Sequence, residues 1–290
     1  YKKIASSTWP LQGVVQGDDI SNLIMVNIDK KLFFNGILDN DGVQLSNAHL
    51  ISGNRDKGLA QDGFVVSIDH TDLDLKSWIP FIERIIDSSK TAKEQVSLFP
   101  ELRALNAQIG NLDLSGIHFD DLEMRLRPSS DGMTMRLNAK ELRAQVVLPP
   151  SGSSRPIAIE ADYLRLNLPK LEEGASAKAD SQVNLSGEDL SWLARMPAIA
   201  FNCSDCKVDN YQLDRVSMSL FGDGEKLVIP ELVVDKQEHV LRGQGQWQAG
   251  VTRVAGIMNS KDIGELFDEF DLTSTIKDSK ASIGYQLQWN

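Results

Sequence analysis

Hydrophobic and polar residues alternate along much of the chain, in short blocks. In residues 105–148, apolar side chains occupy every second position of each block. A period of two is typical of β-strands with one apolar and one solvated face. Between blocks the alternation slips by one residue, at Gly110-Asn111, Ser115-Gly116 and Asp120-Asp121. Each slip predicts a bulge, bend or turn that keeps one face apolar, and only Ser130-Asp131-Gly132 has the composition of a full hairpin turn.

The same pattern occurs a second time, in residues 199–229. Aligning Asp120 with Asp214, an offset of 94 residues, places the slips at equivalent positions. The turn signal Asp131-Gly132 then corresponds to Asp223-Gly224, after a two-residue deletion. Identity between the copies is low, but coinciding slips are not readily produced by chance. The pattern therefore predicts an internal repeat.

A chain of such strands is expected to be mainly β and antiparallel, and its apolar faces must be covered. A sandwich or barrel with a dry core would cover them, and so would one long sheet curled into a groove wide enough for an acyl chain. The strand pattern allows both. The aligned apolar positions that would line a groove are Leu112, Leu114, Ile117, Phe119, Leu122, Met124, Leu126, Met133, Met135, Leu137, Val208, Tyr211, Leu213, Val216, Met218 and Leu220.

Three strands are followed by an Asp-containing polar step and a short amphipathic segment, as in D-L-D-L-K-S-W-I-P-F-I. Such a helix could cap one end of a β layer or be a plain connector. The periodicity predicts short helices near 77–88, 189–195 and 261–269. We expect three segments: 1–97, a β-strand segment that ends in a helix; 98–193, one repeat; and 194–290, a second repeat.

Net charge and hydropathy narrow the class of protein. The net charge is −11, which argues against a nucleic-acid partner. The longest uninterrupted apolar run is four residues, too short to span a bilayer. The chain starts at Tyr1 and stops at Asn290, directly after a strand-like stretch. We therefore expect a piece of a longer chain, with any anchor outside it.

Candidate chemistry is sparse. Cys203 and Cys206 form a C-x-x-C pair, but zinc would need two further ligands and no other His or Cys is nearby in the sequence. The pair replaces Ile109 and Leu112 of the first copy, which favours small apolar residues that could form a disulfide in an oxidising compartment. The four histidines have no metal-ligand spacing. We expect no enzyme activity, no metal and no cofactor.

Several of these stretches resemble the AsmA-like envelope proteins. The resemblance is carried by L-D-L-S-G-I-H-F-D-D-L-E-M-R-L, by S-D-G-M-T-M-R-L-N-A-K-E-L-R-A-Q-V-V-L and by L-R-G-Q-G-Q-W. The segments D-L-D-L-K-S-W-I-P-F-I and K-A-S-I-G-Y-Q-L-Q-W are similar to the largest of these proteins, near the C-terminal part of its β region. The resemblance to the family covers most of residues 60–290 and is weaker over residues 1–60. The cysteine pair is not part of the family pattern.

The resemblance implies a periplasmic segment of a Gram-negative protein, anchored to the inner membrane by a part not present here. It implies a twisted sheet curled into an open apolar groove that carries phospholipids toward the outer membrane and supports its barrier. The expected partners are phospholipid acyl chains and, through other parts, both membranes. A structural or adhesive β-rod with a closed core is the alternative, and a piece of a periplasmic hydrolase is another.

Overall fold

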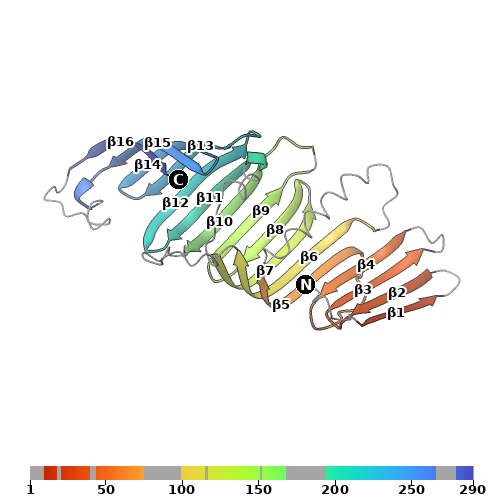
Figure 1. Cartoon of the computed structure of the whole chain (residues 1–290). Coiled ribbons are helices and arrows are strands. Elements are labelled where there is room, and N and C mark those ends of the chain that lie inside the picture. Colours follow the sequence, from red (N-terminus) through yellow and green to blue (C-terminus); the bar gives the residue numbers. More distant parts are fainter. Residues whose placement is uncertain are drawn as a thin grey trace. The chain divides into compact units, whose positions relative to one another are not determined.

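The computed structural model describes residues 10–17, 21–39, 44–74, 99–114, 117–150, 152–167, 194–265 and 279–289. These residues are mainly β: they form sixteen strands and only two helical turns, at 194–195 and 263–265. The chain divides into two compact units, Tyr1–Glu141 and Leu142–Asn290. In each unit the strands lie side by side in chain order, so each sheet is open, as the resemblance implied (Figure 1).

The first unit contains eight strands (Figure 1). The strands β1 to β4 are antiparallel neighbours, β5 pairs in parallel with both β4 and β6, and β6 to β8 are antiparallel again. Their bounds are β1 (Leu11–Gly17), β2 (Ser21–Ile28), β3 (Leu32–Asp39), β4 (Leu45–Ser52), β5 (Gly63–Asp74), β6 (Leu102–Leu114), β7 (Ile117–Ser129) and β8 (Gly132–Asn138).

The second unit also contains eight strands. Its neighbours are antiparallel except for β10 and β11, which are parallel. Their bounds are β9 (Leu142–Leu148), β10 (Ile157–Leu166), β11 (Ile199–Val208), β12 (Tyr211–Gly222), β13 (Leu227–Lys236), β14 (His239–Gln248), β15 (Val251–Ser260) and β16 (Ala281–Trp289). The division into segments 1–97, 98–193 and 194–290 stays a prediction.

Three strand pairs of the expected antiparallel sheet are parallel instead: β4–β5, β5–β6 and β10–β11. Parallel neighbours need a connection that returns to the starting end, usually of a dozen or more residues. Residues 75–101 join β5 to β6 and residues 167–198 join β10 to β11, whereas the shorter loop 53–62 joins β4 to β5. The helices predicted near 77–88 and 189–195 fall in the two longer connections and lie almost wholly outside the described residues. Of the helix predicted over 261–269, residues 261–265 are described, and 263–265 are helical.

The hairpins follow the predicted offset between the two copies. Strands β6 and β7 meet at the pair Leu114–Ile117, and β11 and β12 meet at Val208–Tyr211, 94 residues later. The slip at Ser115-Gly116 thus falls between two antiparallel strands, and the expectation that only 130–132 is a full hairpin turn is wrong. The predicted turn at 130–132 is confirmed by the pairing of β7 with β8.

A loop covers one face of the first sheet. Residues 53–62 lie over β3, β4 and β5, where Asn35 Nδ2 donates to Asp56 at 2.9 Å. His49 Nδ1 is 2.7 Å from Gly58 O, and His49 Nε2 is 2.9 Å from Ser67 Oγ. Ile51, on the same face, is fully buried. On the opposite face of the same strands, Phe99 packs against Phe34 and Phe64, with ring centroids 6.1 and 5.3 Å apart.

Candidate functional site

The face of the first unit that lies opposite the loop carries a row of apolar residues that crosses all eight strands. Neighbours in a β ladder that pair directly have side chains on the same face. The row consists of Gly13, Val26, Phe34, Leu50, Val66, Leu105, Leu126 and Met135, each paired with the next. All but Gly13, which is exposed, are half-buried. They form a partly solvated apolar face rather than a closed core.

The second unit has two such rows. The first consists of Val146, Ile159, Phe201, Met218, Leu232, Gly243, Gly256 and Tyr285, and the second of Ala144, Ala161, Cys203, Val216, Val234, Leu241, Met258 and Ile283. Since neighbouring strands lie ~4.8 Å apart, each row is about 34 Å long. No charged residue stands in any of the three rows. We call these surfaces the apolar face of each unit.

The opposite face of the second unit is polar. Arg215 and Asp235 form an ion pair of 2.7 Å between β12 and β13, and Asn202 donates to Glu160 at 2.9 Å between β11 and β10. Such exposed pairs add little stability. They keep this side hydrated, so each strand of the region has one wet and one apolar face.

A break in the regular pairing brings residues three apart onto the same face. In the second unit, Leu213 and Val216 contact one buried cluster, together with Cys203 and Cys206. Asp214, between the first two, has a φ of 53°, in the left-handed region that a regular strand never enters. In the first unit the equivalent spacing separates the buried Phe119 and Leu122, with φ 53° at Asp121. The slip at Asp120-Asp121 is thus a break in the strand, as predicted, and at Gly110-Asn111 the buried Ile109 and Leu112 also lie three residues apart.

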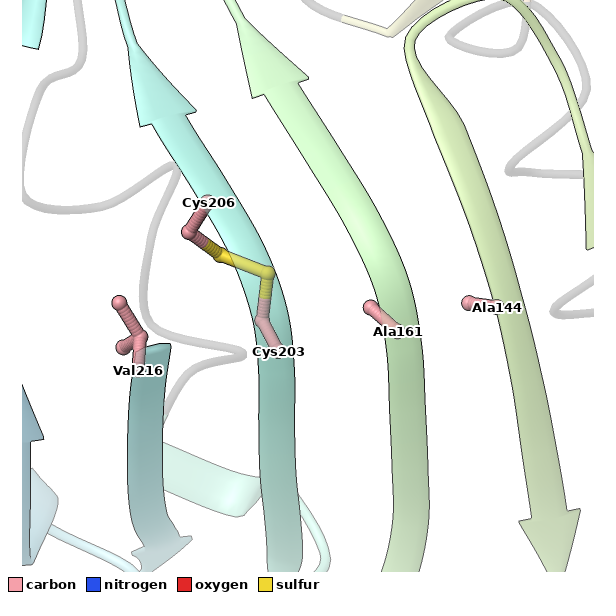
Figure 2. Close-up of a cluster of buried hydrophobic side chains, with 5 residues drawn as sticks. All are labelled: Ala144, Ala161, Cys203, Cys206 and Val216. Atoms are coloured by element: carbon pink, nitrogen blue, oxygen red, sulfur yellow. A yellow bond between two sulfur atoms is a disulfide. The ribbon is translucent and has the colours of Figure 1, made fainter. Parts of the chain in front are cut away.

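The two cysteines form a disulfide across this break, and their Cα atoms are 6.0 Å apart. Both are only 4% exposed, and they lie with Ala144, Ala161 and Val216 on the same side of β9 to β12 (Figure 2). The prediction of small apolar residues at these two positions agrees with this burial. The disulfide therefore links the two sides of the break where both cysteine side chains are buried.

The predicted lining residues occupy the apolar faces in different degrees of burial. Leu112, Phe119, Leu122 and Val216 are buried, Tyr211 is exposed, and the side chain of Leu114 lies outside the described ones. The other ten are half-buried: Ile117, Met124, Leu126, Met133, Met135, Leu137, Val208, Leu213, Met218 and Leu220. That they bind lipid stays a prediction.

Sequence reasoning missed more than half of each row. The strands β2 to β5, β9, β10 and β13 to β16 contribute apolar residues that were left out because only the aligned repeat blocks were considered. The same alternation marks them, as in L-V-I-P-E-L-V-V. The rows could have been found by extending the pattern to every strand.

One polar pair interrupts the apolar face of the first unit. Ser52 Oγ and His70 Nε2 are 2.8 Å apart, and both belong to ladder positions of this face. Burial lowers the pKa of His70 below its ordinary value, although the neighbouring Asp69 acts in the opposite direction. A neutral imidazole at neutral pH adds no charge to the face.

The part of the chain that the structure describes shows no group of side chains arranged for catalysis or for metal binding. No group of three His, Cys, Asp or Glu side chains there could hold a metal ion. His49 and His239 each contact a serine hydroxyl, but both pairs are buried and serve as cross-strand contacts. Among the described residues, no helix is both long and apolar enough to cross a bilayer.

Comparison with known proteins agrees with the strand pattern. The family model described as "YhdP protein" matches residues 1–290. No curated protein and no solved structure matches the chain. The match extends over the full chain, including residues 1–60, where the resemblance to AsmA-like proteins was weakest. The chain therefore belongs to the YhdP family of AsmA-like cell-envelope proteins.

Proposed function

We propose that the apolar faces bind phospholipid acyl chains and that the chain is a segment of a lipid-transfer path in the cell envelope. The observation that carries the proposal is the set of uncharged rows that cross eight strands in each unit, in which most side chains are half-buried and the buried ones gather at Ala144, Ala161, Cys203 and Val216. A sheet that only needed a core would bury these side chains. Contiguous exposed apolar surface of this extent is typical of binding surfaces.

Acyl chains fit this surface better than a compact ligand does. The rows offer length and low polarity but no convergent set of polar groups that would hold a headgroup. Each buried methylene contributes about 0.8 kcal/mol, so contact along a chain of ten would supply roughly 8 kcal/mol. Binding of this kind depends on acyl length, and lipids of different headgroups share the same path.

The compartment follows from the family and the disulfide. YhdP-family membership places the protein in the cell envelope. A disulfide between Cys203 and Cys206 is expected to persist in an oxidising space such as the periplasm. We propose a periplasmic segment, with an inner-membrane anchor and the approach to the outer membrane supplied by other parts of the protein. We propose no catalytic role.

A structural β-rod is the second candidate, because Ala144, Ala161, Cys203 and Val216 of the second row are already buried in one cluster. The two proposals differ in whether lipid reaches the rows. In a closed rod, the faces would be packed by protein and would hold no phospholipid.

Lipid carried by the purified chain tests the proposal. The protein is expressed in a Gram-negative host, purified without detergent and extracted, and phospholipid is quantified by mass spectrometry. We expect bound phospholipid in the wild type and a loss of more than half in Met218→Asp/Leu232→Asp, a directly paired couple on the apolar face. The matched control is Ser217→Asp, on the polar face of the same strand, which should retain its lipid. A lipid-free wild type would favour the closed rod.

A further inference from the structure

Two glycines face each other on the apolar face of the second unit. Gly243 on β14 pairs with Gly256 on β15, and Gly256 pairs with Tyr285 on β16. Because neither glycine has a side chain, the row contains a recess two positions wide. The Tyr285 hydroxyl lies over both glycines, close to the Cβ position of each, and its Cζ is 3.4 Å from the Cβ position of Gly243. The backbone oxygens of Arg242 and Ala255 form the floor of the recess beside the two glycines.

Burying the Tyr285 hydroxyl in the recess costs free energy. The hydroxyl is buried and has no hydrogen-bond partner among the described residues. Burial also raises the pKa of Tyr285. Leaving a buried donor unsatisfied is unfavourable, and rotation of the ring toward water would restore its hydrogen bonds. The hydroxyl therefore shifts the equilibrium between the closed and rotated positions toward the rotated one by on the order of tenfold. Packing of the ring over the glycines favours the closed position.

The walls of the recess accept only an apolar occupant. The ladder neighbours on this face are uncharged: Leu232, Leu241, Val254, Met258 and Ile283. A charged or strongly polar group would be desolvated there without a partner. A run of methylenes meets no such penalty.

We propose that Tyr285 is a gate on the lipid path: it closes the Gly243–Gly256 recess when the path is empty and turns outward to admit an acyl chain. The inference rests on the proposed function and adds a movable element to it. The hydroxyl sets the balance, because it makes the closed position less stable than a phenyl ring would. Tyr285 is thus a positioning residue for the acyl chain.

Two substitutions at Tyr285 should act in opposite directions. Phenylalanine removes the unsatisfied hydroxyl, so the gate stays closed, and alanine removes the gate. The full chain is loaded from vesicles of phosphatidylethanolamine with a diazirine-bearing acyl chain, irradiated, digested and mapped. We expect labelling of residues 241–258 to fall about fivefold in Tyr285→Phe and to rise in Tyr285→Ala. The melting temperature of Tyr285→Phe should rise.

The controls separate the gate from the path. Tyr163→Phe removes a hydroxyl from a ring that lies against Arg143 and Arg165, at 5.5 and 4.9 Å, and should change nothing at the recess. Labelling of residues 199–220 reports the path itself. If that peptide is labelled and recess labelling is unchanged, or falls in both Tyr285 variants, the gate is overturned while the proposed function stands. If no peptide of the second unit is labelled, the proposed function fails as well.

Discussion

A charge placed at Val216 should unfold the second unit at neutral pH and be tolerated in acid. Val216 is 8% exposed, and its neighbours in the cluster are Ala144, Ala161 and the disulfide. None of these side chains can donate a hydrogen bond to a carboxylate. In Val216→Asp, losing the buried valine costs about 2 kcal/mol. Desolvation that raises the carboxyl pKa by ~3 units adds about 4 kcal/mol while the group is ionised.

The pH dependence distinguishes the charge from the lost packing. An Asp with a raised folded-state pKa binds its proton more tightly when folded, so the penalty falls as pH drops from that pKa toward ~3.9. Between pH 7 and pH 5, Val216→Asp should recover about 2–3 kcal/mol relative to wild type. Val216→Asn removes the same packing without a titrating group, so its deficit should not change with pH.

Urea unfolding followed by circular dichroism at pH 5 and pH 7 measures the loss of stability of Val216→Asp and of Val216→Asn relative to wild type. Met218→Asp, two residues along the same strand and half-buried, should cost less than 2 kcal/mol at pH 7, because water reaches that position. The reasoning is refuted if Val216→Asp and Val216→Asn are equally stable at pH 7. Equal stability would mean that water also reaches position 216.

Three further outcomes are expected. Replacing Cys203 and Cys206 together by alanine should lower the free energy of unfolding by about 2 kcal/mol, because so short a link contributes about that much through loop closure. The variant should keep its bound lipid, and a folded variant without lipid would contradict this. Burial lowers the pKa of His49, so the first unit should lose stability as pH falls through ~6.5, and the loss should be absent in His49→Gln, measured by urea unfolding between pH 5 and 8. Asp214→Gly should keep or raise the melting temperature, whereas Asp214→Val should lower the free energy of unfolding by about 1–2 kcal/mol, because φ is 53° there.

The strands were predictable because each carries its own alternation, and so were the breaks, because a slip in phase is visible in the letters. The parallel pairs were not predicted, although the signal was present. A strand, an amphipathic segment and a second strand, as around residues 75–101, is the pattern of a parallel crossover. The segment was interpreted as a cap on a β layer or a plain connector, and neither interpretation included a crossover between parallel strands.

Contacts that depend on distant segments could not be predicted in the same way. The loop that buries His49 is polar and carries no hydrophobic period, so nothing in its letters shows which face it covers. Likewise, Gly243 and Tyr285 are 42 positions apart. Only the register of three strands shows that one fills the space left by the other.

The aligned breaks restrict how such a chain can gain or lose residues over generations. A one-residue deletion beside Asp121 would turn the rest of β7 inside out, with polar residues toward its apolar neighbours. On the neighbouring strand β6, the buried Ile109 and Leu112 pair with Leu122 and Phe119 across the same level, so both strands would have to change length together. Turns carry no such restriction, and the two-residue difference between the copies falls where β7 and β12 end, before Asp131 and Asp223. Length variation in chains of this kind should therefore accumulate at the hairpin tips and be rare at the level of the breaks.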